Sequence, residues 1–94
     1  MALGVVETRG YTAAVEAMDA MCKGAQVSVA EVKIPGGGHV TLLVTGEVAA
    51  VSSAVQAGVT AAEKVGGDRI SSFVIPSPHP ELDRYLGIKE EKNG

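Results

Sequence analysis

The sequence has few aromatic residues, a single cysteine and no excess of basic charge. Its aromatic residues are two Tyr and one Phe, and Trp is absent. Its 8 basic residues are outnumbered by 11 acidic ones, for a net charge of −3. Without a basic stripe or an aromatic platform, nucleic-acid binding is disfavoured. The lone thiol, Cys22, excludes both a disulfide within the chain and a cysteine-based zinc site.

The sequence also shows no export signal or membrane span. The N-terminus has no basic stretch followed by an apolar one. The longest uncharged run, Val48 to Ala62, has 15 residues and contains Ser, Gln and Thr, so it is too short and too polar to cross a bilayer. The single cysteine fits a reducing compartment, and we expect a cytoplasmic protein.

The apolar part of the chain consists mainly of Ala and Val. Apolar residues make up 46% of the 94 residues, a length typical of one modest domain. Because small side chains bury little area each, at about 25 cal/mol per Å², a core built from them is thin. We therefore expect oligomerisation to add stability.

Residue patterns predict alternating strands and helices in two similar halves. β-Branched runs bounded by Gly and Pro indicate strands, and apolar residues at helical spacing indicate helices. The order favours an α+β, ferredoxin-like βαββαβ sandwich with two main helices on a four-stranded antiparallel sheet. The expected elements are strands at 3–8, 27–34, 40–44 and 70–75, helices between Gly10 and Gly24 and at 47–65, and a short C-terminal helix at 81–86.

Each expected helix has a recognisable apolar side. In the first helix, Asp19 and Lys23 form a favourable i,i+4 pair on the polar side, and Cys22 is expected to be a buried, inert thiol. The expected apolar positions of the first helix are Ala14, Val15, Met18, Met21, Cys22 and Ala25, and those of the second are Val48, Val51, Val55, Gly58, Ala62 and Val65.

The second helix has no charged residue between Glu47 and Glu63. Its outward positions are Ala49, Ser52, Ser53, Gln56 and Thr60. A solvated helix face usually carries Lys and Glu. This composition suggests neighbours on more than one side, and the alternative is a surface of low charge.

The segment "IPGGGHV", residues 34–40, joins the second and third expected strands. A simple hairpin needs one or two glycines, and this segment has three in a row. A phosphate loop is disfavoured because such glycines lead into a helix, whereas these lead into a strand. Two interpretations remain: a flexible hairpin, or a loop that closely approaches a ligand or symmetry copies of itself.

No arrangement of residues indicates catalysis or metal binding. His39 and His79 are 40 positions apart, with no ligand at metal-site spacing, and each fits a loop or surface residue better. Glu7, Glu16 and Asp19 could form paired carboxylates, but Glu16 and Asp19 fit the polar side of the first helix better. The segment "IPSPHP" terminates a strand or presents Ser77 and His79 on a stiff contact surface.

Three long stretches together resemble a known family. These are "ALGVVETRGYTAAVEAMDAMCKGAQV", "GGGHVTLLVTGEVAAVSSAVQAGVTAAEKVG" and "VIPSPHPELDRYL". They are similar to the single-domain shell proteins of bacterial microcompartments, such as carboxysomes and the propanediol- and ethanolamine-utilising organelles. The resemblance covers residues 2 to about 86 without visible insertions. It implies one BMC domain at 1–88. The charged residues that follow, 89–94, predict a disordered tail.

The resemblance implies flat cyclic homohexamers that tile edge to edge in a microcompartment shell. The loop between the second and third strands would line a central pore. The implied pore-lining residues are Ile34, Pro35, Gly36, Gly37, Gly38 and His39. The family loop is similar to "KIGSG", so Gly37 stands at its serine position and Lys33 lies one position before its lysine. We expect a pore lined by backbone groups, wider or more variable than in relatives.

At the hexamer edge, Lys23 matches a lysine that the family packs against its copy in the next hexamer. Gln26 replaces the usual asparagine. The segment "PSPH" matches the family's "PRPH", with Ser77 in place of arginine and His79 kept. The loss of that arginine removes a planar, multiply donating group from the contact.

The implied role is structural and non-enzymatic, with no cofactor and no metal. The implied partners are further copies of the chain, other shell proteins, encapsulated enzymes and metabolites that pass through the pore. The alternative from a different class is a ferredoxin-like regulatory module, a dimer or trimer in which Gly36 to Gly38 close over a small molecule. A small enzyme is the third class, and it would need a catalytic pair that the sequence does not present.

Overall fold

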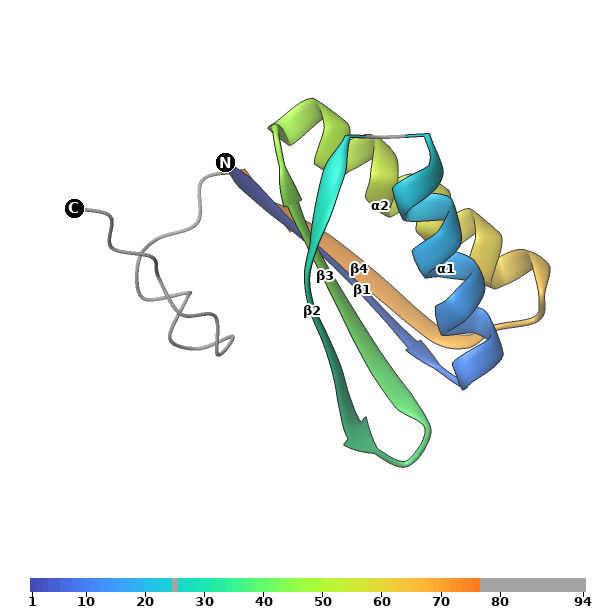
Figure 1. Ribbon diagram of the computed structural model, residues 1–94. Coiled ribbons are helices and arrows are strands. Elements are labelled where there is room, and N and C mark those ends of the chain that lie inside the picture. Colours follow the sequence, from blue (N-terminus) through green and yellow to red (C-terminus); the bar gives the residue numbers. More distant parts are fainter. Residues whose placement is uncertain (25, 77–94) are drawn as a thin grey trace.

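Two helices cover one face of a four-stranded antiparallel sheet (Figure 1). The structure is a computed structural model, and it describes residues 1–24 and 26–76. The short helix expected at 81–86 and the tail at 89–94 lie outside these residues. The elements are β1 (Ala2–Arg9), α1 (Tyr11–Lys23), β2 (Val27–Gly36), β3 (His39–Gly46), α2 (Val48–Lys64) and β4 (Asp68–Ile75).

The strand order is β2-β3-β1-β4, and every neighbouring pair is antiparallel. This order confirms the predicted ferredoxin-like βαββαβ fold. Each element agrees with its expected bounds to within two residues, and the extensions of β2 and β3 shorten the turn between them to two residues. The edges of the sheet are β2 and β4, so α1 and β2 form one flank of the molecule and α2 and β4 the other.

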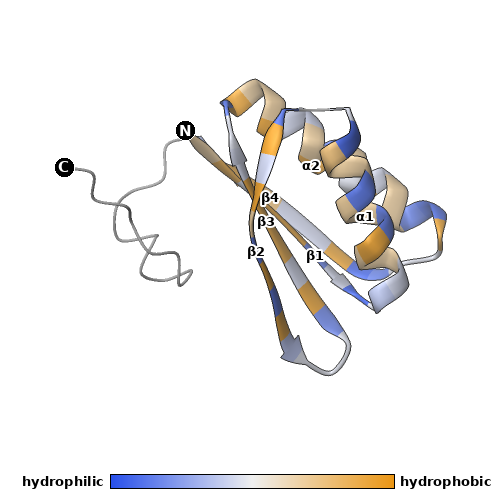
Figure 2. Cartoon of the chain, viewed as in Figure 1, coloured by the Kyte–Doolittle hydropathy of each residue, from blue (hydrophilic) through white to orange (hydrophobic). Residues whose placement is uncertain are grey.

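The main core lies between the helices and the sheet. Alternate residues of the strands point toward the helices, and this alternation is visible along β2 and β3 in Figure 2. Ala2, Val6 and Leu42 belong to this core. A smaller cluster of Leu3, Val5 and Leu43, with Ile75 packed against it, lies on the opposite face of the sheet.

The helices approach closely because small residues meet where they cross. A Cβ added at Gly58 of α2 would lie 2.7 Å from Cγ of Met21 and 3.4 Å from the carbonyl oxygen of Ala17, both on α1. Glycine at this position therefore lets α1 and α2 pack closely.

The buried side of α1 agrees only in part with the predicted one, since Ala14 and Met21 are buried as predicted. The buried residues are Ala13, Ala14, Ala17 and Met21. Val15 and Cys22 are exposed, so the prediction that Cys22 is buried is wrong. The close crossing of α1 over α2 requires small residues, and this places Ala17 at the centre of the contact instead of the larger apolar residues. In α2, the middle of the predicted stripe is buried, whereas its ends, Val48 and Val65, are half-exposed.

Gly4→Ala is expected to destabilise the fold by about 1–3 kcal/mol, because over-packed cores cost that much. The new Cβ would lie 2.6 Å from Cγ1 of Val51 and 2.7 Å from Cγ2 of Val55, two stiff, buried side chains. The control is Gly24→Ala, where the Cβ meets nothing within 4 Å and φ is −108°. Urea unfolding measures both variants, and equal stabilities would contradict this description of the core.

Candidate functional site

The glycine segment forms a tight hairpin between β2 and β3. Gly36 pairs with His39, and Gly37 and Gly38 form the two-residue turn between them. The φ angles of these three glycines are +128°, +64° and +80°. Left-handed angles at both central residues are typical of the hairpin turn whose twist matches the strands. The turn itself therefore uses two glycines, as expected for a simple hairpin, and Gly36 before it also adopts a positive φ.

Steric crowding within the chain does not require these glycines. A Cβ on Gly36 would meet nothing within 4 Å, and one on Gly37 would meet only Cδ2 of His39, at 3.5 Å. The hairpin tip projects from one end of the sheet (Figure 1). Ile34, Pro35 and His39 are exposed there. The six residues predicted to line a pore thus lie together at this tip.

A polar row crosses the face of the sheet opposite the helices, next to the hairpin. The Glu7 carboxylate accepts hydrogen bonds from Oγ1 of Thr41 at 3.3 Å and from Oγ of Ser71 at 3.0 Å. These three residues are neighbours in register on β3, β1 and β4. Glu7 is therefore a cross-strand acceptor, and its role follows from a register that sequence spacing did not reveal.

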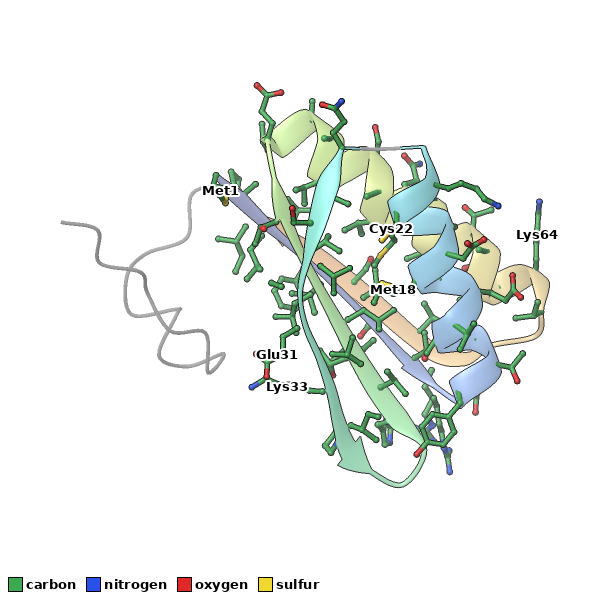
Figure 3. The ribbon with its side chains drawn as sticks, in the orientation of Figure 1. Met1, Met18, Cys22, Glu31, Lys33 and Lys64 are labelled. Carbon is green, nitrogen blue, oxygen red and sulfur yellow. The ribbon has the colours of Figure 1, made fainter. Side chains whose placement is uncertain are left out.

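Charged side chains continue around this row. Arg9 lies opposite His39 in the β1–β3 pairing, and its guanidinium is 3.9 Å from the Asp68 carboxylate. Glu31 and Lys33 extend from β2 on the side away from the helices (Figure 3). Glu16 and Asp19 lie exposed on α1, as predicted.

The predicted edge residues lie at the C-terminal end of α1. Lys23 is the last residue of α1, and its side chain is 73% exposed. Its Nζ lies 3.1 Å from Oδ2 of Asp19, which confirms the predicted i,i+4 pair. Gln26 is exposed just before β2. The other two edge residues, Ser77 and His79, lie outside the described residues.

An apolar groove between α1 and β2 was not predicted. Its volume is about 420 Å³. Val15 is 65% exposed in this region and Val32 is 46% exposed. The sequence pattern assigned Val15 to the apolar side of the first helix, so its exposure, and with it the groove, was not predicted. The groove is lined by Ala14, Val15, Met18, Asp19, Val32 and Leu42.

Two sulfur atoms lie beside this groove. Sγ of Cys22 is 3.9 Å from Sδ of Met18, one helical turn away on α1 (Figure 3). Among residues 1–24 and 26–76, no three His, Cys, Asp or Glu side chains are grouped closely enough to hold a metal ion. The helices of this part of the chain are also too short or too polar to cross a membrane.

Comparison with known proteins identifies the family. The BMC domain matches residues 2–78. The chain belongs to the BMC domain family. This BMC protein is 44% identical over 91 residues to carboxysome shell protein CsoS1A of Hydrogenovibrio crunogenus, covering 97% of its own length and 95% of the relative's. It is 47% identical over 87 residues to carboxysome shell protein CsoS1 of Prochlorococcus marinus, covering 93% and 84%.

A solved structure has the same fold. The crystal structure of a microcompartment protein from Desulfitobacterium hafniense superposes with a TM-score of 0.80 at 40% identity. The match covers 88% of this BMC protein and 47% of that chain, so the protein spans about half the length of its structural neighbour.

These matches confirm the predicted family and its structural role. The chain is a shell protein of a bacterial microcompartment and assembles with itself and with other shell components. The relatives named here are shell proteins, and this favours the shell role over the small-molecule-binding regulatory module.

Proposed function

We propose that this BMC protein forms flat cyclic homohexamers that tile edge to edge, with a central pore lined by residues 34–39. The observation that carries the proposal is the match to carboxysome shell proteins over nearly the whole of both chains. The protein acts without catalysis or cofactor. Its partners are further copies, other shell proteins, the enclosed enzymes and the small metabolites that pass through the pore.

The arrangement of the elements supports a radial orientation of each chain. The hairpin tip lies at one end of the strands, and Lys23 and Gln26 lie near the other end (Figure 1). With the hairpin at a six-fold axis, Lys23 stands at the rim of the disc. Neighbouring chains then meet flank to flank, the α1–β2 flank of one against the α2–β4 flank of the next.

In this orientation, a neighbouring chain lies against the exposed apolar groove. The groove with Val15 and Val32 belongs to the α1–β2 flank, and a neighbouring chain covers it in the ring. Between Glu47 and Glu63, the exposed residues of α2, which include Ser53 and Gln56, are uncharged. Uncharged residues suit a surface that faces other chains in the disc better than a fully solvated one.

The pore itself consists of backbone at its narrowest part. Gly36, Gly37 and Gly38 present N–H and C=O groups and no side chains. Oriented backbone amides can attract anions without a charged side chain. Six copies of this turn leave room at the axis for a small polar metabolite.

Gly37→Asn is expected to narrow the pore without disturbing the hairpin. Asn tolerates left-handed φ, and Asn-Gly is a favoured sequence for this turn. Hexamers in a planar bilayer should keep their mass and melting temperature while their conductance falls by about half or more, since pore diameter limits conduction. The control, Thr12→Asn at an exposed position of α1, should conduct as wild type. An unchanged conductance for Gly37→Asn hexamers would contradict a pore at this turn.

Electron microscopy of the purified protein in moderate salt tests the assembly. The proposal predicts sheets with a hexagonal lattice. Discrete dimers or trimers that bind a small molecule saturably would support the regulatory module instead.

A further inference from the structure

The hairpin turn is tied to the corner between β1 and α1 by one short hydrogen bond. The Gly10 N–H donates to the carbonyl oxygen of Gly38 at 2.6 Å. The β1–β3 pairing ends at Arg9 and His39. The Gly10–Gly38 bond is therefore one residue beyond the paired strands and holds the turn itself. A Cβ on Gly38 would lie 3.9 Å from N of Gly10 and 4.0 Å from Cγ of Arg9, which places the turn directly against the corner.

The donor of this bond is held in place from two sides. The Gly10 carbonyl accepts from the Ala14 N–H at 3.3 Å and from Oγ1 of Thr8 at 3.3 Å, and Thr8 is fully buried. Gly10 is the N-cap residue of α1, with φ +112° and ψ +134°, a conformation suited to glycine. The N–H of an N-cap residue has no partner within the helix, so it is free to bond elsewhere.

We propose that Gly10 is a positioning residue for the pore. Three consecutive glycines give the turn a large conformational freedom, and the Gly10 N–H restricts it by fixing the Gly38 carbonyl. The corner of α1 therefore sets how far the turn extends toward the axis, and with it the width of the pore. The consequence at the pore rests on the proposed hexamer, whereas the hydrogen bond is a property of the single chain.

Amide hydrogen exchange of the wild-type protein tests whether the Gly10 N–H is hydrogen-bonded to the Gly38 carbonyl. The Gly10 N–H should exchange about 100-fold or more slowly than a free amide, because a stable hydrogen bond protects it. The Thr12 N–H is the internal reference, since an amide in the first turn of a helix has no i−4 partner. Exchange of Gly10 as fast as Thr12 would overturn the proposal. This measurement does not depend on hexamers, so it separates a failed tie from a failed pore assignment.

Gly10→Ala tests the effect on the pore. The added Cβ meets nothing within 4 Å, but its φ of +112° is unfavourable for an L side chain, so the corner must shift. Gly24→Ala, at the other end of α1, is the control with open space and an ordinary φ of −108°. If the wild-type protein forms no hexamers, the proposed function fails. The exchange result still shows whether the Gly10–Gly38 hydrogen bond forms.

The expected signature is a change in pore width without a change in pore chemistry. Gly10→Ala hexamers should change conductance by about twofold or more, because diameter controls conduction. Their reversal potential in a salt gradient should stay at the wild-type value, because the lining groups are the same. A lower melting temperature with wild-type conductance would overturn the proposal. Should the variant fail to fold, the exchange of Gly10 in the native protein decides.

Discussion

Val15→Glu is expected to break the hexamer into smaller species while each chain keeps its fold. Val15 is 65% exposed, so a glutamate there is solvated in the single chain. In the proposed ring, a neighbouring chain covers this side chain together with Val32. A carboxylate buried without a partner costs about 3 kcal/mol or more at each interface. Because a closed ring of six contains six such interfaces, the effect on assembly is large.

Analytical ultracentrifugation measures this effect, and circular dichroism checks the fold. The matched control is Thr12→Glu, which adds the same charge at an exposed position on the side of α1 that also carries Glu16. An acidic residue is also favourable in the first turn of a helix. The control should sediment as the full ring. A full-sized ring for Val15→Glu would show that the groove does not lie between chains.

Lys23→Ala is expected to abolish sheets and leave hexamers intact. In the proposed tiling, this lysine packs against its copy in the next hexamer. Within the described chain, it pairs with Asp19 at 3.1 Å, and both side chains are largely exposed. An exposed i,i+4 pair is worth about 0.3–0.5 kcal/mol, so its loss hardly affects the fold. The ring should therefore form, whereas its edge contact is lost.

Lys64→Ala is the matched control for the edge. Lys64 is the last residue of α2, is exposed and points away from the protein (Figure 3). Both variants remove one lysine from the end of a helix, so they change the net charge equally. Electron microscopy should reveal sheets for Lys64→Ala and separate hexamers for Lys23→Ala. Sheets of wild-type extent from Lys23→Ala would refute the edge assignment.

The order of the elements could be predicted because strong local signals separate them. β-Branched runs and Gly breaks define the strands, and the predicted bounds agree with the structure to within about two residues at most ends. The buried side of α1 could be predicted only in part, since Ala occupies several sides of that helix. The contact of Ala17 and Met21 with Gly58 selects one side, and it depends on how two distant segments cross.

The candidate site was predictable only in part. The pair of Asp19 and Lys23 follows from helical spacing, and the grouping of residues 34–39 follows from a hairpin. Glu7 accepts hydrogen bonds from Thr41 and Ser71 because the register of three strands places these residues side by side. Residue spacing does not determine that register. The tie from Gly10 to Gly38 likewise joins residues that lie far apart in sequence and meet only in the folded sheet.

The mass of the tag-free protein in moderate salt, measured by light scattering, tests the central claim most directly. Six chains of 9.6 kDa each predict a particle of about 58 kDa, with larger species appearing on standing as sheets form. A stable dimer or trimer with no larger species would contradict the cyclic hexamer, and with it the assignment of the glycine hairpin to a pore.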